Sequence, residues 1–308
     1  MSAGKTFALN SGDKIPALGL GTWRSETNKV KEAVKAGYNI GYRHFDCAAV
    51  YENQDEVGQA FAESKISRDQ VWVTSKLWNT EHRPDRVEPA LNQTLKALGL
   101  DYLNLYLMHW PLAFKKVEGK FCESVKDSNG KPALDENVSL LDTWHAMEAL
   151  VAKGKVRNIG VSNCNIAQLT QILEHGKIKP AVNQIEVHPY NPNTKLLQFC
   201  KDHGIHVTAY CPIGSTGSPK VLEDPAVLEV AKETGKTPAQ VVLAWGIGRG
   251  TSVIPKSVTP SRIEENFHGD FQLTDAQAKK ISAVTNRVRV CEVRDTWNLK
   301  SDSLFGDD

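Results

Sequence analysis

Residues 71–110 decide the fold: VWVTSKLW (71–78) is followed by PDRVEPALNQTLKALG (84–99) and then by LNLYLMHW (103–110). The two outer segments are apolar runs, as in strands that are covered on both faces. The middle segment carries aliphatic residues three or four positions apart, with Pro84 in its first turn and Gly99 after its end. Strand, helix and strand in this order predict a parallel βαβ unit.

The same alternation of apolar run and amphipathic segment continues in both directions. Eight runs are typical of buried parallel strands: Leu18–Gly21, Arg43–Asp46, Val71–Lys76, Leu103–His109, Asn158–Ser162, Ala181–Glu186, His206–Tyr210 and Thr251–Pro255. Eight strands alternating with helices predict an α/β fold, a closed (β/α)8 TIM barrel, as a single domain over residues 1–308. A doubly wound sheet is the alternative, but no Gly-x-Gly-x-x-Gly opens a first helix, as a Rossmann unit requires.

Turn and cap residues set the limits of several predicted elements. Gly37 is expected to end the first helix, and Asn165 is expected to cap the helix after the fifth strand. Lys5–Ala17 alternates weakly around an Asn-Ser-Gly-Asp turn, which predicts a β-hairpin over the barrel bottom. Pro111–Asn137 is too long for a plain loop at the C-terminal face, and Arg287–Asp308 is a second irregular segment.

The bulk composition excludes several classes of partner. Of 308 residues, 41% are hydrophobic and 24% are charged, and the net charge of +1 gives no general attraction to nucleic acid or to an anionic membrane. No apolar run reaches the roughly 18 residues of a membrane helix, and Met1–Thr6 lacks the features of a signal peptide. We therefore expect a cytoplasmic protein, working as a monomer. The six cysteines are scattered without a Cys-x-x-Cys pair, which predicts reduced thiols and no metal site.

Four reactive side chains follow three consecutive predicted strands. Asp46 ends the second strand, Tyr51 lies five residues further on, Lys76 ends the third strand and His109 ends the fourth. The active site of a (β/α)8 barrel lies at the C-terminal ends of its strands, so these groups are expected to meet there. Each of them alone has a structural explanation, such as a helix cap or a half-buried ring. Together they form a set suited to proton transfer.

The predicted proton donor of this set is Tyr51. A free tyrosine has a pKa of about 10 and is a sluggish acid at neutral pH. An ammonium close to the phenol stabilises the phenolate, so we predict that Lys76 lowers the pKa of Tyr51, with Asp46 as the counter-charge that a buried lysine needs. His109 is placed to orient a substrate carbonyl. Such a donor contributes about 10²–10⁴ in rate, and a hydride carrier must lie beside it.

At this point the chain is seen to resemble the aldo-keto reductases over nearly its whole length. The motifs that carry the resemblance are Gly19–Trp23, Gly41–Asp46, Ser75–Trp78, Met108–Pro111, Gly160–Asn163 and Ile254–Thr259, followed by Arg262, Glu265 and Asn266. The resemblance implies a (β/α)8 barrel that reduces aldehydes or ketones reversibly. It also places the family's catalytic tetrad on Asp46, Tyr51, Lys76 and His109.

The resemblance further implies where NADPH or NADP+ would bind. The nicotinamide would be held by Ser162, Asn163, Gln184 and Tyr210, the last stacking on its ring. The 2′-phosphate would meet Lys256, Ser257, Thr259 and Arg262 through charge-assisted hydrogen bonds, with Glu265 and Asn266 at the adenine. The remaining implied contacts are Gly21, Thr22, Trp23, Asp46, Cys211, Pro212, Ile213, Gly214, Ser215, Ile254, Pro255 and Val258.

Large apolar side chains near the strand ends predict the substrate pocket. The predicted lining consists of Trp23, Val50, Tyr51, Trp78, His109, Trp110, Phe114 and Trp297. Such a wall would favour aromatic and medium-chain aldehydes, although core filling explains any one of these rings alone.

Two other functional classes remain as alternatives. A barrel isomerase or phosphate-dependent hydrolase is disfavoured because the sequence has no metal cluster and no paired-carboxylate acid and base. A regulatory protein that binds the cofactor with little turnover stays open, and the intact tetrad weighs against it.

Overall fold

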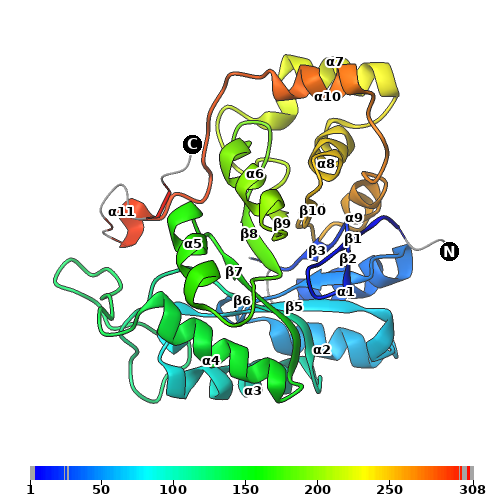
Figure 1. The fold of residues 1–308 in the computed structure, drawn as a ribbon. Coiled ribbons are helices and arrows are strands. Elements are labelled where there is room, and N and C mark those ends of the chain that lie inside the picture. The colour runs from blue at the N-terminus through cyan, green and yellow to red at the C-terminus, as the bar shows by residue number, and fades with distance from the viewer. Residues whose placement is uncertain (1–3, 24, 26–27, 298, 300–303, 306–308) are drawn as a thin grey trace.

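The computed structural model describes residues 4–23, 25, 28–297, 299 and 304–305 (Figure 1). One sheet of eight parallel strands has the order β10-β9-β8-β7-β6-β5-β4-β3, so each strand pairs with its neighbour in sequence. Parallel bridges from Leu18 to Val253 and from Gly21 to Lys256 join the two outermost strands, and the sheet forms the predicted (β/α)8 barrel. The strands are β3 Leu20–Gly21, β4 His44–Asp46, β5 Trp72–Leu77, β6 Leu103–Met108, β7 Val156–Ser162, β8 Val182–Glu186, β9 His206–Tyr210 and β10 Ser252–Val253.

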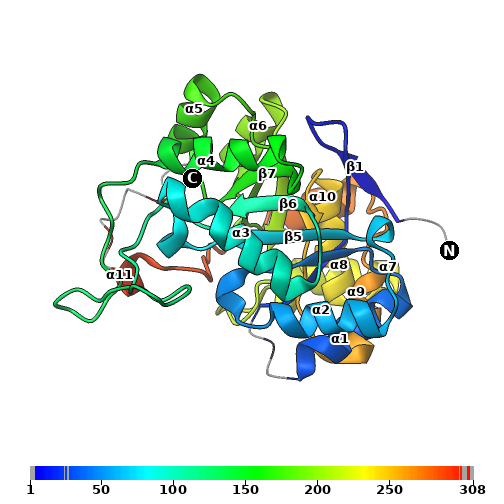
Figure 2. The same cartoon turned by 90° about the horizontal axis from the view of Figure 1, so that it is seen from below.

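Helices surround this sheet, as the two views at right angles show (Figures 1 and 2). The helices are α1 Lys29–Ile40, α2 Gln54–Glu63, α3 Pro84–Leu98, α4 Leu140–Ala152, α5 Ile166–His175, α6 Thr194–Asp202, α7 Pro225–Thr234, α8 Pro238–Gly248, α9 Pro260–Phe267, α10 Asp275–Ser282 and α11 Arg294–Trp297. None of the helices among the described residues has the length and apolar character to cross a membrane.

The predicted helix limits are confirmed in most places. Pro84 is the first residue of α3, Gly99 ends it with a φ of 65°, and Asn165 caps α5 by accepting a hydrogen bond from the backbone N–H of Gln168. The prediction that Gly37 ends the first helix is wrong, because α1 continues to Ile40. Gly37 lies inside the helix and packs closely on β3 instead, since a Cβ there would lie 2.9 Å from Leu20 Cδ2.

The predicted hairpin is confirmed as β1 (Thr6–Ala8) paired antiparallel with β2 (Lys14–Pro16). Ile15 is fully buried in a cluster with Trp72, Leu105 and Leu107, so the hairpin closes one end of the barrel. The opposite end is where β4 to β10 terminate. A site at that end therefore has a closed floor.

The long segment Pro111–Asn137 is folded on itself by isolated antiparallel bridges. It is also tied to the barrel, because Arg83 pairs with the buried Asp135 at 2.8 Å and the Phe114 N–H donates to the Asn79 carbonyl. Of the predicted irregular tail Arg287–Asp308, residues 294–297 form α11, whereas 298, 300–303 and 306–308 lie outside the described residues, as do Met1–Ala3.

Candidate active site

Lys76 is the centre of the candidate active site. It is fully buried near the end of β5, and its Nζ lies 2.5 Å from Asp46 Oδ1, 2.8 Å from the Cys47 carbonyl oxygen and 3.3 Å from Tyr51 Oη. Asp46 ends β4, and Tyr51 ends η1 (Ala49–Tyr51), the short 3-10 helix that follows. Pairing of β4 with β5 brings the three side chains together. Sequence gave no signal for the Cys47 carbonyl, because any residue type supplies a backbone oxygen.

The prediction that the pKa of Tyr51 is lowered is wrong. The pKa of the Tyr51 phenol is raised well above 10, first by burial and then by the negative charge of Asp46. The Asp46 carboxylate contacts the ammonium directly, so it offsets the field of Lys76 at the phenol oxygen. Tyr51 therefore carries its proton at neutral pH.

His109 lies beside Tyr51, with ring centroids 5.8 Å apart and planes at 76°. Burial first, and then the charges of Lys76 and His82, lower the pKa of His109 well below 6.5, so its ring is neutral at neutral pH. Its Nδ1 is buried and has no hydrogen-bond partner among the residues described. This leaves Nε2 as the nitrogen that can meet a ligand.

Four residues assigned to the nicotinamide form one hydrogen-bonded network at the ends of β7, β8 and β9. Tyr210 Oη donates to Asn163 Oδ1 at 2.7 Å, and Asn163 Nδ2 donates to Ser162 Oγ at 3.0 Å. Ser162 Oγ donates in turn to the backbone carbonyl of Gln184 at 2.7 Å. The side chain of Gln184 donates to Asp46 Oδ2 at 2.8 Å, a contact that was not predicted. Asp46 thus joins this network to Lys76, which contacts Tyr51.

The residues assigned to the 2′-phosphate lie together around the start of α9. Ser257 Oγ accepts the backbone N–H of Thr259 at 3.1 Å, and Thr259 precedes the first residue of the helix. Lys256 and Arg262 are exposed on either side of it. Two cations next to a helix N-terminus form a local environment that favours an anion.

The other residues predicted to contact the cofactor differ in their exposure and in their hydrogen bonds. Thr22 Oγ1 donates to the Asp46 carbonyl at 2.9 Å, and Trp23 is 37% exposed. The turn 211–215 closes with a hydrogen bond from the Gly214 N–H to the Cys211 carbonyl at 2.9 Å. Glu265, by contrast, accepts the hydroxyl of Thr237 through Oε1 at 2.8 Å. Its carboxylate therefore links α9 to the cap of α8.

Four of the predicted pocket residues meet in one aromatic cluster. Trp297 lies at the centre, 4.9 Å from Trp110, 5.1 Å from Phe114 and 6.2 Å from Trp78 between ring centroids. Trp110, Phe114 and Trp297 are buried, so much of their area packs loop 111–137 against the C-terminal tail. Trp78 is half-buried and lies 5.2 Å from His109, which connects the cluster to the predicted proton-transfer residues. Val50 and Trp23 are not in this cluster.

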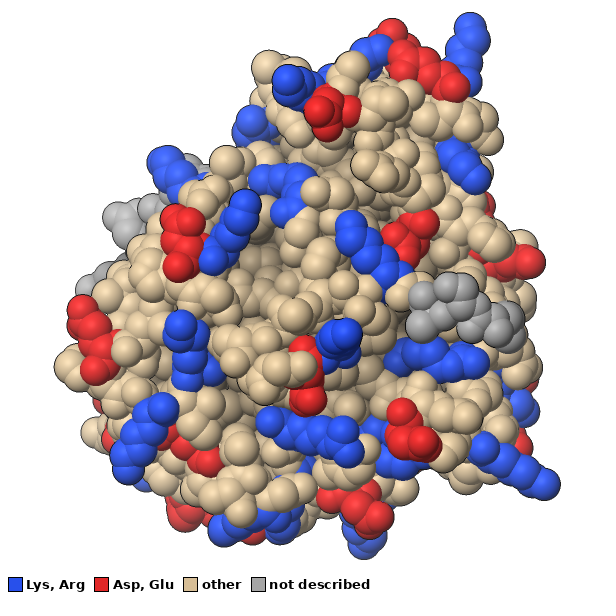
Figure 3. All heavy atoms as spheres, turned by 45° about the vertical axis from the view of Figure 1, so that its right-hand side comes forward, with Lys and Arg blue, Asp and Glu red and all other residues tan. Residues whose placement is uncertain are grey.

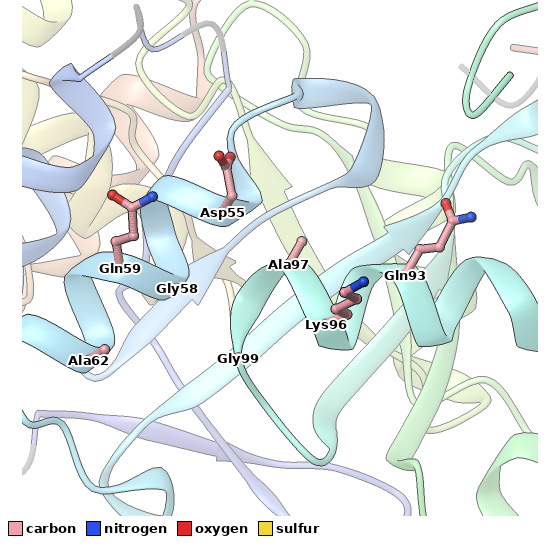
Figure 4. Close-up of a pocket in the computed structure, with 8 residues that line it drawn as sticks. All are labelled: Asp55, Gly58, Gln59, Ala62, Gln93, Lys96, Ala97 and Gly99. Carbon is pink, nitrogen blue, oxygen red and sulfur yellow. The ribbon is translucent and has the colours of Figure 1, made fainter.

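A hollow of about 560 Å³ lies elsewhere, between α2 and α3 (Figure 4). Its lining includes Asp55, Gln59, Gln93 and Lys96, and none of the predicted site residues contributes to it. Acidic and basic side chains are interspersed over the face drawn in Figure 3, in keeping with the small net charge. Any attraction for an anion is therefore local, as at the start of α9.

Comparisons with known proteins agree with this geometry. The model of the Aldo/keto reductase family matches residues 17–286. An uncharacterised oxidoreductase of Schizosaccharomyces pombe is 47% identical over 92% of this chain and 89% of that protein. Human aldo-keto reductase family 1 member A1 is 44% identical over 93% of this chain and 91% of that protein. Among solved structures, an aldose reductase from Schistosoma japonicum has a TM-score of 0.91 and 43% identity over 99% of both chains. The chain belongs to the aldo/keto reductase family of oxidoreductases.

Proposed function

We propose that this protein is an NADPH-dependent reductase of aldehydes and ketones, reversible towards alcohol oxidation, with Tyr51 as the general acid. The observation that carries the proposal is the contact of Lys76 with both Asp46 and the Tyr51 phenol. The aldose reductases and aldo-keto reductases among its relatives support the reaction class. We further propose that it acts as a single-domain monomer.

The contacts of Lys76 determine in which direction the Tyr51 O–H can donate its hydrogen bond. A lysine ammonium has three N–H donors and no acceptor, and here the three face Asp46, the Cys47 carbonyl and the Tyr51 oxygen. Because Lys76 donates to the phenol oxygen, the Tyr51 O–H is left to donate to another group. A substrate carbonyl between Tyr51 and the neutral His109 would accept that hydrogen bond, and then the proton.

The residues present fit a dinucleotide with a 2′-phosphate. Ser162, Asn163 and Gln184 offer hydroxyl and amide groups on the side of the barrel that adjoins Asp46, and Lys256 with Arg262 supplies positive charge further out. When bound, the cofactor supplies the hydride that the chain itself lacks. Tyr210 would stack on the nicotinamide ring and hold it next to Tyr51. The β1–β2 hairpin closes the opposite end of the barrel.

Simple turnover distinguishes this proposal from a regulatory cofactor-binding protein. We expect the purified chain to consume NADPH when glyceraldehyde or a nitrobenzaldehyde is added, followed as loss of reduced nicotinamide absorbance. Binding of NADPH without consumption, over a panel of aldehydes and ketones, would favour the regulatory alternative.

The reduction rate should be insensitive to pH near neutrality. Tyr51 must be protonated and its pKa is raised above 10, while His109 must be neutral and its pKa is lowered below 6.5. Both groups are thus in the required state from about pH 6.5 to about pH 9, so kcat/KM for reduction should be flat there. A steady-state pH profile checks this, and a fall centred near pH 7 would mean that a different acid is at work.

Preference for NADPH should depend on Lys256 and Arg262. Replacing either by Met should weaken NADPH binding by about 1.5–3 kcal/mol, the usual value of hydrogen bonds to charged groups, and leave NADH binding nearly unchanged. Fluorescence titration with both coenzymes measures this. Lys279→Met, which removes an exposed lysine from α10, is the matched control and should change neither affinity. Equal weakening of both coenzymes would disprove the phosphate assignment.

Trp110 should matter for aromatic substrates. Trp110→Ala is expected to raise KM for aromatic aldehydes about tenfold, the factor that corresponds to 1.4 kcal/mol of lost apolar contact, and to change KM for glyceraldehyde less. Phe121→Ala removes a more exposed ring from the adjoining loop 111–137 and should leave both values unchanged. Equal losses for all substrates in Trp110→Ala would show that the cluster only packs the tail.

A further inference from the structure

Glu186 is a buried carboxylate that holds the C-terminal tail against the barrel. It is the last residue of β8 and is fully buried. Its Oε1 accepts the backbone N–H of Val290 and its Oε2 accepts that of Cys291, each at 2.7 Å. His188 Nε2 donates to the same Oε1 at 3.0 Å. Because a buried carboxylate is costly without such donors, these bonds tie the tail firmly to the end of the strand.

The strand end that carries Glu186 is itself fixed. The Glu186 carbonyl accepts the side-chain amides of Asn191 at 2.9 Å and Asn193 at 2.7 Å. Glu186 also pairs in register with Tyr210 of β9. Residues two apart on a strand share one face of the sheet, so Glu186 lies on the same face as Gln184, whose side chain contacts Asp46. The tail is therefore anchored on the face of the strand that carries the candidate site.

Beyond its anchored residues, the tail leads directly into the aromatic cluster. Trp297 lies in α11, which begins at Arg294, and its ring centroid is 4.9 Å from that of Trp110 and 5.1 Å from that of Phe114. Only a short stretch of chain separates Cys291 from this ring. A change in the anchored backbone therefore moves Trp297 relative to the two rings that it contacts.

We propose that Glu186 is a positioning residue for substrate selection, which fixes the tail and thereby places Trp297 in the wall that contacts an aromatic carbonyl substrate. The nature of the substrate rests on the proposed function, whereas the anchoring of the tail does not. Glu186 acts through the tail and not on the reacting atoms. Its loss should therefore change which substrate is preferred and leave the chemical step intact.

Glu186→Gln tests this role with little change in side-chain shape. An amide has one acceptor oxygen and an NH2 group that only donates. When its oxygen accepts the N–H of Val290 or of Cys291, its NH2 group faces the other N–H, donor against donor. The loss of one hydrogen bond changes an equilibrium by about tenfold, so the tail should detach about ten times as often.

Glu148 of α4 provides a closely matched control. It is also buried, and its Oε1 accepts the backbone N–H groups of Lys177 at 2.6 Å and Ile178 at 2.7 Å, while His145 Nδ1 donates to its Oε2 at 3.0 Å. Lys177 and Ile178 precede β8, whereas Glu186 ends it. Glu148→Gln thus creates a similar mismatch toward the opposite end of the barrel. A general loss of stability appears in both variants, but a loss of tail positioning appears only in Glu186→Gln.

Limited digestion of the full chain with trypsin measures detachment of the tail without any substrate. Arg289 and Arg294 are half-buried tail residues after which trypsin can cut. Cleavage that is slow relative to reclosing follows the population of the detached tail. We expect mass spectrometry to show cleavage at these residues about tenfold faster in Glu186→Gln than in the unaltered chain, and unchanged in Glu148→Gln.

Steady-state kinetics with two substrates measures selection. In Glu186→Gln, we expect KM for a nitrobenzaldehyde to rise about tenfold, while KM and kcat for glyceraldehyde stay nearly unchanged. Glu148→Gln should keep the ratio of the two KM values even if its Tm falls. An unaltered ratio in Glu186→Gln, or the same change of ratio in Glu148→Gln, would overturn the proposal.

A second variant removes the same bond from the tail and leaves the barrel unaltered. Val290→Pro lacks the N–H that Glu186 Oε1 accepts, so it should reproduce both the faster cleavage and the change in KM ratio. A normal KM ratio in a Val290→Pro chain with faster tail cleavage would also overturn the proposal. If the unaltered chain turned over no aldehyde, the proposed function would fail and substrate selection with it. Faster tail cleavage in Glu186→Gln would then still support the anchoring.

Discussion

Tyr51→Phe is expected to lower kcat for carbonyl reduction by about 10²–10⁴, the usual contribution of a positioned proton donor. The substitution removes one oxygen, and with it the hydroxyl proton that the contact with Lys76 leaves to donate to a substrate. NADPH binding should survive, because its proposed contacts come from β7, β8, β9 and the start of α9. Single-turnover kinetics and fluorescence titration of NADPH measure the two quantities separately.

A matched substitution shows that the effect belongs to the site. Tyr106 is fully buried on β6, and its hydroxyl has no hydrogen-bond partner among the described residues. Tyr106→Phe therefore removes the same atom at little cost, and we expect nearly unaltered activity and stability. If Tyr51→Phe retained a kcat close to that of the unaltered enzyme, the general-acid assignment would be wrong.

Lys76→Met should damage both activity and stability. The Asp46 carboxylate is 2% exposed, and it would lose the ammonium at 2.5 Å while keeping, among the described residues, the Gln184 amide as its side-chain partner. Removing one member of a buried ion pair costs about 3–5 kcal/mol, because the other charge stays buried and unpaired. Urea denaturation measures this loss. Turnover should also fall by at least about 10², since nothing then orients the Tyr51 proton.

The double variant Asp46→Asn with Lys76→Met separates the two effects. Removing the second charge as well should restore most of the stability, because no unpaired ion remains, but it should not restore turnover. An equally unstable double variant would mean that lost packing, and not an isolated charge, explains Lys76→Met. Recovered activity in the double variant would contradict the role of Lys76 in orienting the proton.

The sequence by itself predicted the barrel and which reactive side chains lie at one end of it. Apolar runs with helical stripes between them recur eight times, and each run corresponds to a strand of the closed sheet. Asp46, Lys76 and His109 could be placed at one end because parallel strands present their C-terminal ends on the same side. Local signals such as Pro84, Gly99 and Asn165 also gave correct helix limits. These features depend on periodicity and on residues close in sequence.

Only the tertiary structure decided the electrostatics and the long-range contacts. The rise in the pKa of Tyr51 depends on burial and on the nearby charge of Asp46, which no spacing reveals. The role of Gly37 depends on how closely α1 packs on Leu20, and the sequence shows only a glycine. Glu186 likewise looks like an ordinary strand end until the tail returns to it from residues 290 and 291. Periodicity is a property of neighbouring residues, whereas desolvation and ion pairing depend on distances that exist only after the chain has folded.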